Sequence, residues 1–149
     1  METINVTETM KTTTTINATK GELVNTINGL FSVQELKGKK FSLVVSKNIA
    51  ILQETLKELE SAGKPSKEFM ELATQVNEIA NKNEDGAKEQ IDNIEQENKE
   101  LVEARRAQMT EVEEMMKEEV SVDLHILKED ILPEEVTAQQ ITKLIKIIE

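Results

Sequence analysis

Apolar side chains recur every three or four positions over much of this chain, which is the spacing of one helix face. It predicts a helix over about 42–62, where the steps of four, three, four and three form a heptad seam. Gly63 and Pro65 then end or kink that helix. Further helical spacing covers about 66–82 and resumes over about 87–118. The residues of the first seam are Val45, Ile49, Leu52, Leu56 and Leu59.

The polar stretch NKNEDG, at 81–86, separates two apolar-striped segments of similar length, 42–82 and 87–118. At 1.5 Å per residue each segment would span about 45–60 Å. Long apolar stripes joined by a short polar loop commonly pack against each other as an antiparallel hairpin. The alternative is one continuous helix over 66–118 in a coiled coil between subunits, and Asn98 on the seam is compatible with both. The hairpin is the preferred interpretation.

The apolar period changes from helical to strictly alternating in the stretch EEVSVDLHILKED, residues 118–130. Alternation predicts a half-buried strand over about 120–126, with Val120, Val122, Leu124 and Ile126 on its inner face. A lone strand leaves its backbone groups unpaired, so it needs a partner. The Thr-rich N-terminus, 1–18, supplies a strand or an arm, with 3–7 as the pairing residues. The stretch FSLVV, at 41–45, is a weaker candidate.

Two capping boxes mark the starts of shorter helices. The stretches TKGE at 19–22 and TAQQ at 137–140 predict helices over about 20–31 and 138–148. The expected fold is therefore mainly α, of the α+β class. It consists of a long antiparallel helical hairpin with a small β element and a short C-terminal helix at its base, forming a single domain over 19–149.

The charge of the chain is strongly acidic and unevenly distributed. It has 29 acidic and 18 basic residues, a net charge of −11. Residues 1–50 carry six Lys and four Glu, whereas the rest carries 12 basic and 25 acidic residues, so the net charges are +2 and −13. Nucleic acids and anionic membranes are bound by basic faces. We therefore expect neither as a partner.

Several classes of protein are disfavoured by what the sequence lacks. It has no Cys, which excludes disulfides, thiolate metal sites and cysteine nucleophiles. No apolar run approaches the roughly 18 residues of a membrane span. The stretch METINVTETM has neither the basic nor the apolar region of a secretory signal. We therefore expect synthesis in the cytoplasm and no secretion by a signal peptide.

The candidates for catalysis and metal binding are weak. His125 lies two residues after Asp123, and such a pair can orient an imidazole for base catalysis. However, no serine stands in a Gly-rich nucleophile elbow, and a surface histidine on a strand is the preferred interpretation. NKNEDG lacks the glutamate that closes a calcium loop, and KGKK, at 37–40, lacks the first glycine and the Ser/Thr of a P-loop. We expect no enzyme, no metal and no cofactor.

A cluster of methionines is the candidate for partner contact. It lies in the stretch AQMTEVEEMM and consists of Met109, Val112, Met115 and Met116. Methionine side chains make adaptable binding surfaces. Filling of the protein core competes with this interpretation and is favoured.

The acidic span 84–119 offers a second hypothesis for binding. It has 13 acidic and five basic residues, and a rod of this kind could mimic the phosphates of a nucleic-acid duplex. Mimicry needs unbroken rows of carboxylates. The basic residues Lys88, Lys99, Arg105, Arg106 and Lys117 interrupt such rows, so this hypothesis is disfavoured.

Two stretches together resemble a known family. SKNIAILQETLKELE, at 46–60, and EEVSVDLHILKEDILPEEVTAQQITKLIKIIE, at 118–149, resemble small proteins of unassigned function encoded by phages and prophages of low-GC Gram-positive bacteria. The resemblance covers about 40–149, and the Thr-rich N-terminus and residues 66–105 depart from it. It implies a phage origin and a non-enzymatic role, and it transfers no catalytic residues.

The expected function follows from this resemblance and from the helical pattern. We expect a phage-encoded protein-interaction protein, a virion or assembly component acting through helix packing and oligomerisation. Its partner would be another copy of itself or another phage protein, and its location the host cytoplasm at synthesis and then the virion. The alternative is a soluble acidic inhibitor of a host enzyme or defence system.

Overall fold

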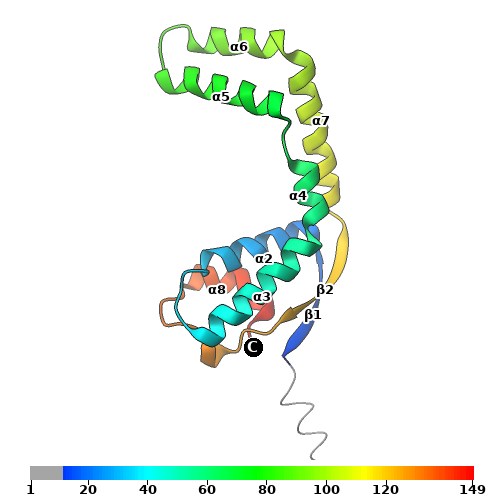
Figure 1. Ribbon diagram of the computed structural model, residues 1–149, viewed down its shortest axis with the longest axis vertical. Helices are drawn as coiled ribbons and strands as arrows, with labels where there is room; N and C mark the ends of the chain where they lie inside the picture. Colours follow the sequence, from blue (N-terminus) through cyan, green and yellow to red (C-terminus); the bar gives the residue numbers. More distant parts are fainter. Residues whose placement is uncertain (1–11) are drawn as a thin grey trace, which may run out of the picture. The chain divides into compact units, whose positions relative to one another are not determined.

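The computed structural model describes residues 12–149, which form seven α-helices, two short 3-10 helices and one two-stranded sheet (Figure 1). This confirms the predicted mainly α fold with a small β element. The predicted pairing residues 3–7 lie outside the described part of the chain. The elements are β1 (Thr13–Thr19), α2 (Lys20–Ser32), α3 (Lys39–Thr55), α4 (Lys57–Gly63), α5 (Lys67–Lys82), α6 (Ala87–Glu97), α7 (Lys99–Met116), β2 (Glu119–His125), η1 (Glu129–Ile131), α8 (Ala138–Leu144) and η2 (Ile145–Ile147).

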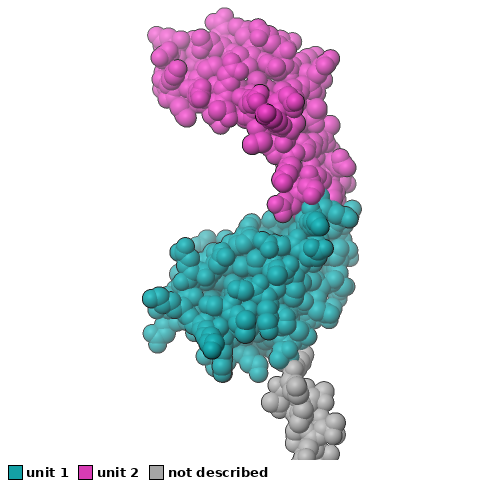
Figure 2. Space-filling model, viewed as in Figure 1, with its two compact units in different colours: residues 1–58, 116–149 teal, residues 59–115 magenta. Residues whose placement is uncertain are grey.

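The chain divides into two compact units (Figure 2). The first contains the described residues up to Glu58 together with Met116–Glu149, and the second contains Leu59–Met115. This differs from the single domain predicted over 19–149. Both boundaries fall inside helices, α4 and α7, whose apolar spacing continues without a break. Periodicity shows which face of a helix is buried, but it does not show which core that face belongs to.

The sheet of the first unit pairs β1 with β2 in antiparallel register, from Thr13 opposite His125 to Thr19 opposite Glu119. The inner residues Ile16, Ala18, Val122 and Leu124 are buried, and their neighbours along each strand are mostly exposed. The predicted strand and its inner face are therefore confirmed, although β2 begins one residue earlier than expected.

The Thr-rich segment is a strand over Thr13–Thr19, so this part of it is not a free arm. The weaker pairing candidate, FSLVV, is wrong because these residues lie inside α3. Phe41 and Val45, which are four residues apart on one face of that helix, are both buried. Helical period therefore outweighs the β-propensity of the valines.

Helices α2, α3 and α8 supply the rest of the first core. Both helices begin at the predicted threonines: the Thr19 hydroxyl accepts from the Glu22 N–H at 3.1 Å, and the Thr137 hydroxyl accepts from the Gln140 N–H at 3.2 Å. The full capping box forms at Thr137, whose own N–H donates to the Gln140 side chain at 2.9 Å, whereas at Thr19 the Glu22 carboxylate accepts from the hydroxyl instead. The final helix is shorter than 138–148, since it tightens into η2 after Leu144. The most deeply buried apolar side chains are Leu23, Leu30, Val33, Phe41, Val45, Leu52, Leu124, Leu127, Leu144 and Ile147.

One polar side chain lies in the middle of this core. Asn48 on α3 is 0% exposed. Its carboxamide nitrogen donates to the His125 carbonyl at 2.9 Å, and its carboxamide oxygen accepts from the His125 N–H at 2.7 Å. The Asn48 side chain therefore bonds to the edge of β2 as a neighbouring strand would, and it provides partners for both the N–H and the carbonyl of His125.

The second unit contains a hairpin that is shorter than the one predicted between 42–82 and 87–118, because α3 belongs to the first unit. Helices α5 and α6 lie side by side (Figure 1), and the chain turns between them with left-handed backbone at Asn83 (φ 48°) and Gly86 (φ 84°). The continuous helix over 66–118 is therefore wrong. The returning segment is also divided, since Asn98 separates α6 from α7 and its side chain donates to the Ile94 carbonyl at 2.8 Å.

Proline at Asp85 should be tolerated. The Ala87 N–H donates to the Glu84 carbonyl at 3.1 Å, and Gly86 has φ 84° and ψ 4°. Those angles are typical of the third position of a type II turn, whose second position favours proline. We expect Asp85→Pro to leave the melting temperature unchanged or to stabilise by about 0.4–1 kcal/mol. Thermal unfolding followed by circular dichroism measures this.

The matched control for this prediction is Asn93→Pro, an exposed position inside α6. Proline within a helix costs about 3 kcal/mol or more. An equal loss of stability in the two variants would contradict the assigned turn.

Candidate interaction surface

The residues first considered for catalysis lie at one end of the sheet. The Asp123 carboxylate accepts a hydrogen bond from the Thr15 hydroxyl at 2.5 Å, across the exposed face. His125 is half-buried, and its backbone groups are those bound by Asn48. Within residues 12–149 no group of three or more His, Asp or Glu side chains is placed to hold a metal ion. The Asp123 carboxylate is therefore bonded across the sheet to Thr15.

The four residues of the methionine cluster have different surroundings. Val112 is 5% exposed, and a methyl group added at Gly63 would lie 3.7 Å from its side chain. Val112 is thus part of the core of the second unit, in agreement with the core-filling interpretation. Met115 and Met116 are half-buried, and Met109 is 39% exposed. Met109 is the member most accessible to a partner.

A network of polar bonds joins α7 to the connection between α4 and α5. The Arg105 guanidinium donates to the Gly63 carbonyl at 2.8 Å and to the Gln108 side-chain oxygen at 2.9 Å. The Gln108 amide donates to the carbonyls of Ala62 at 2.8 Å and Lys64 at 2.6 Å. The last carbonyls of a helix have no partner within it. These bonds therefore satisfy the end of α4.

The same arginine also contacts the start of α5. Its guanidinium lies 5.6 Å from the centre of the Phe69 ring, within the range of a cation–π contact. From the sequence, Arg105 was considered only as one of the basic residues that interrupt the acidic span 84–119. The signal that could have identified its role is the Gly63–Pro65 connection, which leaves carbonyls without helical partners.

The α5–α6 hairpin carries a long apolar stripe that the unit itself covers only in part. No residue of α6 is buried, and Leu72 is the buried residue of α5. We refer to the remaining stripe as the hairpin surface. It is made of half-buried apolar side chains on both helices: Phe69, Ala73, Val76, Ile79, Ala87, Ile91 and Ile94.

A groove of about 510 Å³ runs along the hairpin near its turn. Its apolar lining comes from Ile79, Ala87 and Ile94, and its polar lining includes Lys82 and Glu84. The groove thus combines part of the hairpin surface with a polar rim, which is the usual arrangement of a protein-binding patch.

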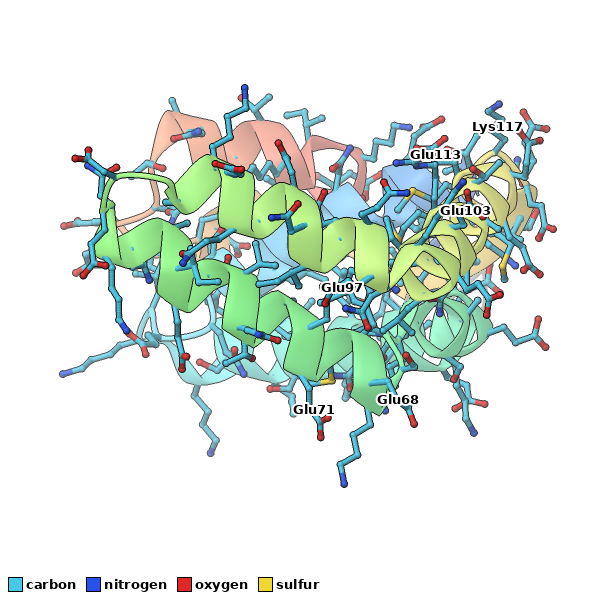
Figure 3. The ribbon with its side chains drawn as sticks, turned by 90° about the horizontal axis from the view of Figure 1, so that it is seen from above. Glu68, Glu71, Glu97, Glu103, Glu113 and Lys117 are labelled. Atoms are coloured by element: carbon cyan, nitrogen blue, oxygen red, sulfur yellow. The ribbon has the colours of Figure 1, made fainter. Side chains whose placement is uncertain are left out.

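The hairpin is acidic. Residues 67–97 carry nine acidic and three basic side chains, a net charge of −6. In Figure 3 the glutamates of α5, Glu68 and Glu71, lie apart from those of α7, Glu103 and Glu113. The acidic side chains of the second unit are therefore spread over more than one side of it.

No family model, curated protein or solved structure matches this chain. Among residues 12–149 no helix has the length and apolar content needed to cross a membrane.

Proposed function

We propose that this chain is a non-enzymatic protein-interaction protein and that the hairpin surface binds a helix of a partner. The observation that carries the proposal is α6, an amphipathic helix in which Ile91 and Ile94 are half-buried and no residue is buried. An isolated pair of short helices is only marginally stable in water without further apolar burial. A partner helix laid along the stripe would supply that burial.

The charge of the hairpin favours a partner that carries basic residues beside its apolar face. Complementary charge speeds association and disfavours wrong partners. Because the hairpin has a net charge of −6, a second hairpin would be repelled, whereas a helix flanked by Lys or Arg would be attracted. We therefore assign this surface to a different protein rather than to another copy.

The biological setting is proposed from the sequence resemblance. A phage-encoded protein with a helix-binding surface would serve as a virion or assembly component. Mass spectrometry of purified virions tests this directly, and finding the protein there at a fixed copy number is the expected result. Its absence from virions, with its gene in a cluster of small early genes, would instead favour the soluble inhibitor of a host enzyme or defence system.

The hairpin surface can be tested in the whole protein. The double variant Ile91→Gln/Ile94→Gln removes apolar contacts that are half-exposed in the free chain, so its melting temperature should change by only a few degrees. Its incorporation into virions, measured by mass spectrometry, should fall at least about tenfold, since two buried aliphatic side chains commonly contribute more than 1.4 kcal/mol to binding.

The matched control is Asp92→Asn/Glu95→Gln, two exposed positions of the same helix. It should be incorporated nearly as well as the wild type. Equal incorporation of the control and of the isoleucine variant would exclude the hairpin surface as the binding site, even if the protein is a virion component.

A further inference from the structure

The backbone groups of β1 that face away from β2 can be identified from the register. The Ile126 N–H donates to the Thr12 carbonyl at 2.7 Å, and the Lys20 N–H donates to the Glu118 carbonyl at 2.9 Å. Antiparallel pairs alternate between bonded and non-bonded positions. The even-numbered residues of β1 therefore bond to β2, and the N–H and C=O groups of Thr13, Thr15 and Asn17 point outward.

The outer edge of β1 is open among the described residues. Within residues 12–149, the hydrogen bonds made by Thr15 and Asn17 outside the β1–β2 ladder are side-chain bonds to Asp123 and Ser121 on the exposed face. The edge of β2 differs, because Asn48 occupies it at His125. An open edge of this kind is a template for pairing with another strand, and proteins commonly protect such edges with charge, proline or a bulge.

The edge of β1 has none of these protections. Residues 12–19 read TTTTINAT and contain no charged residue and no proline, and each residue of β1 has one partner on β2 without a bulge. By contrast, β2 carries Glu119 and Asp123. Since like charges opposite each other destabilise a strand pair, β1 can pair with its own copy without repulsion at the strands, whereas β2 cannot.

A groove lies next to β1 on the side of the sheet that the helices cover. It has a volume of about 420 Å³, and its lining includes Ile16 and Ala18 of β1, Asn25 of α2, and Lys143 and Ile145 at the C-terminal end. None of its lining residues comes from β2. Ile145 is 59% exposed. Ile145 is thus only partly covered at the rim of the groove, whereas Ile16 and Ala18 of β1 are buried.

The rim of this groove is held by an ion pair. The Lys146 ammonium lies 3.0 Å from the Glu22 carboxylate. The hydrogen bond and charge of Lys146, together with the Thr19 hydroxyl, lower the pKa of Glu22 from its ordinary value. The pair neutralises an acidic position beside the edge, so little net negative charge opposes the approach of a second acidic chain there.

We propose that two copies of this chain associate through β1, antiparallel to each other, to form one continuous four-stranded sheet. The register places Ile16 opposite Ile16 of the second copy. Thr15 of each copy then lies opposite Asn17 of the other copy, and the two residues exchange backbone hydrogen bonds. In this register the outward N–H and C=O groups of the two β1 strands meet. The helix-covered faces of the two sheets then lie on the same side of the four-stranded sheet. The inference concerns the first unit and does not depend on the partner proposed for the hairpin surface.

The test is the mass of the full chain in solution, measured by sedimentation equilibrium over a range of concentrations. The expected result is a dimer of about twice 16.8 kDa. Thr15→Pro removes an outward N–H without removing a bond to β2, so it should weaken the dimer about tenfold to a hundredfold through the loss of symmetric hydrogen bonds. A wild type that sediments at 16.8 kDa at all concentrations would overturn the inference.

Ser121→Pro is the matched control. It also removes an N–H that points away from the partner strand and a side-chain bond across the exposed face, but on β2. Circular dichroism verifies that both variants are folded. The control should dimerise as the wild type does, and equal weakening by both prolines would mean that β1 is not the interface.

Hydrogen exchange of the Thr15 and Asn17 amides gives an answer that needs no variant. In the dimer these amides are protected, and the protection should fall on dilution below the dissociation constant. Rapid exchange at all concentrations would mean an unpaired edge. Protection in a chain that sediments as a monomer would mean that another part of the same chain covers the edge. Either of these two results would overturn the proposed dimer.

Discussion

Leu124→Ala should lower the free energy of unfolding by about 2–5 kcal/mol, the usual cost of truncating a buried leucine. Leu124 is 0% exposed on the inner face of β2, where it faces the core of the first unit. Truncation removes its apolar contacts and leaves a cavity that the neighbouring helices can close only in part. Urea unfolding followed by circular dichroism measures the change.

The neighbouring position provides the control for this prediction. His125 lies on the opposite face of the same strand, and its structural bonds are made by its backbone, which His125→Ala retains. We expect a change within about 0.5 kcal/mol, as for most substitutions outside the core. A larger loss for His125→Ala than for Leu124→Ala would mean that the two faces of β2 are assigned the wrong way round.

Asn48→Leu should cost about 2–4 kcal/mol, because a buried backbone group left without a partner costs about 1–3 kcal/mol. Leucine nearly preserves the volume, but it leaves the His125 N–H and carbonyl without the bonds of 2.7 and 2.9 Å that Asn48 makes. The loss should occur in urea unfolding with no change in the slope of the transition, which depends on exposed surface.

Asn28→Leu on α2 is the matched control, since the same replacement is made at an exposed helical position. It should change stability by no more than about 0.5 kcal/mol. A leucine at position 48 that proved neutral or stabilising would show that the edge of β2 does not depend on this side chain.

The local elements were predictable because each depends on residues close together in the chain. The alternation of Val122 and Leu124 with polar neighbours identified β2 and its buried face. The threonines at 19 and 137 identified two helix starts, because a capping side chain bonds to a backbone group three residues away. The glycine at 86 lies where the chain needs left-handed backbone.

Other features depend on residues that are distant in sequence and leave no local pattern. Asn48 occupies a polar position between seam residues, and its partner at His125 is 77 residues away. Arg105 reaches the Gly63 carbonyl across 42 residues. The break between α3 and α4 at Leu56 also left no signal in the sequence. Leu56 is buried like the seam residues before and after it, so the apolar spacing continues through the break. The candidate interaction surface was missed for a related reason, since spacing predicts an apolar face but not whether the fold covers it.

The sheet joins residues that are synthesised far apart in time. Ile16 pairs with Val122, and the whole of the second unit, Leu59–Met115, is made between them. Contacts this distant are slow to form, because the ends of a long loop must first be brought together. The hairpin contacts are local, so α5 and α6 can fold before β2 leaves the ribosome. Until then β1 has both of its edges unpaired, and nascent chains on one messenger are at greatest risk of pairing wrongly through this strand.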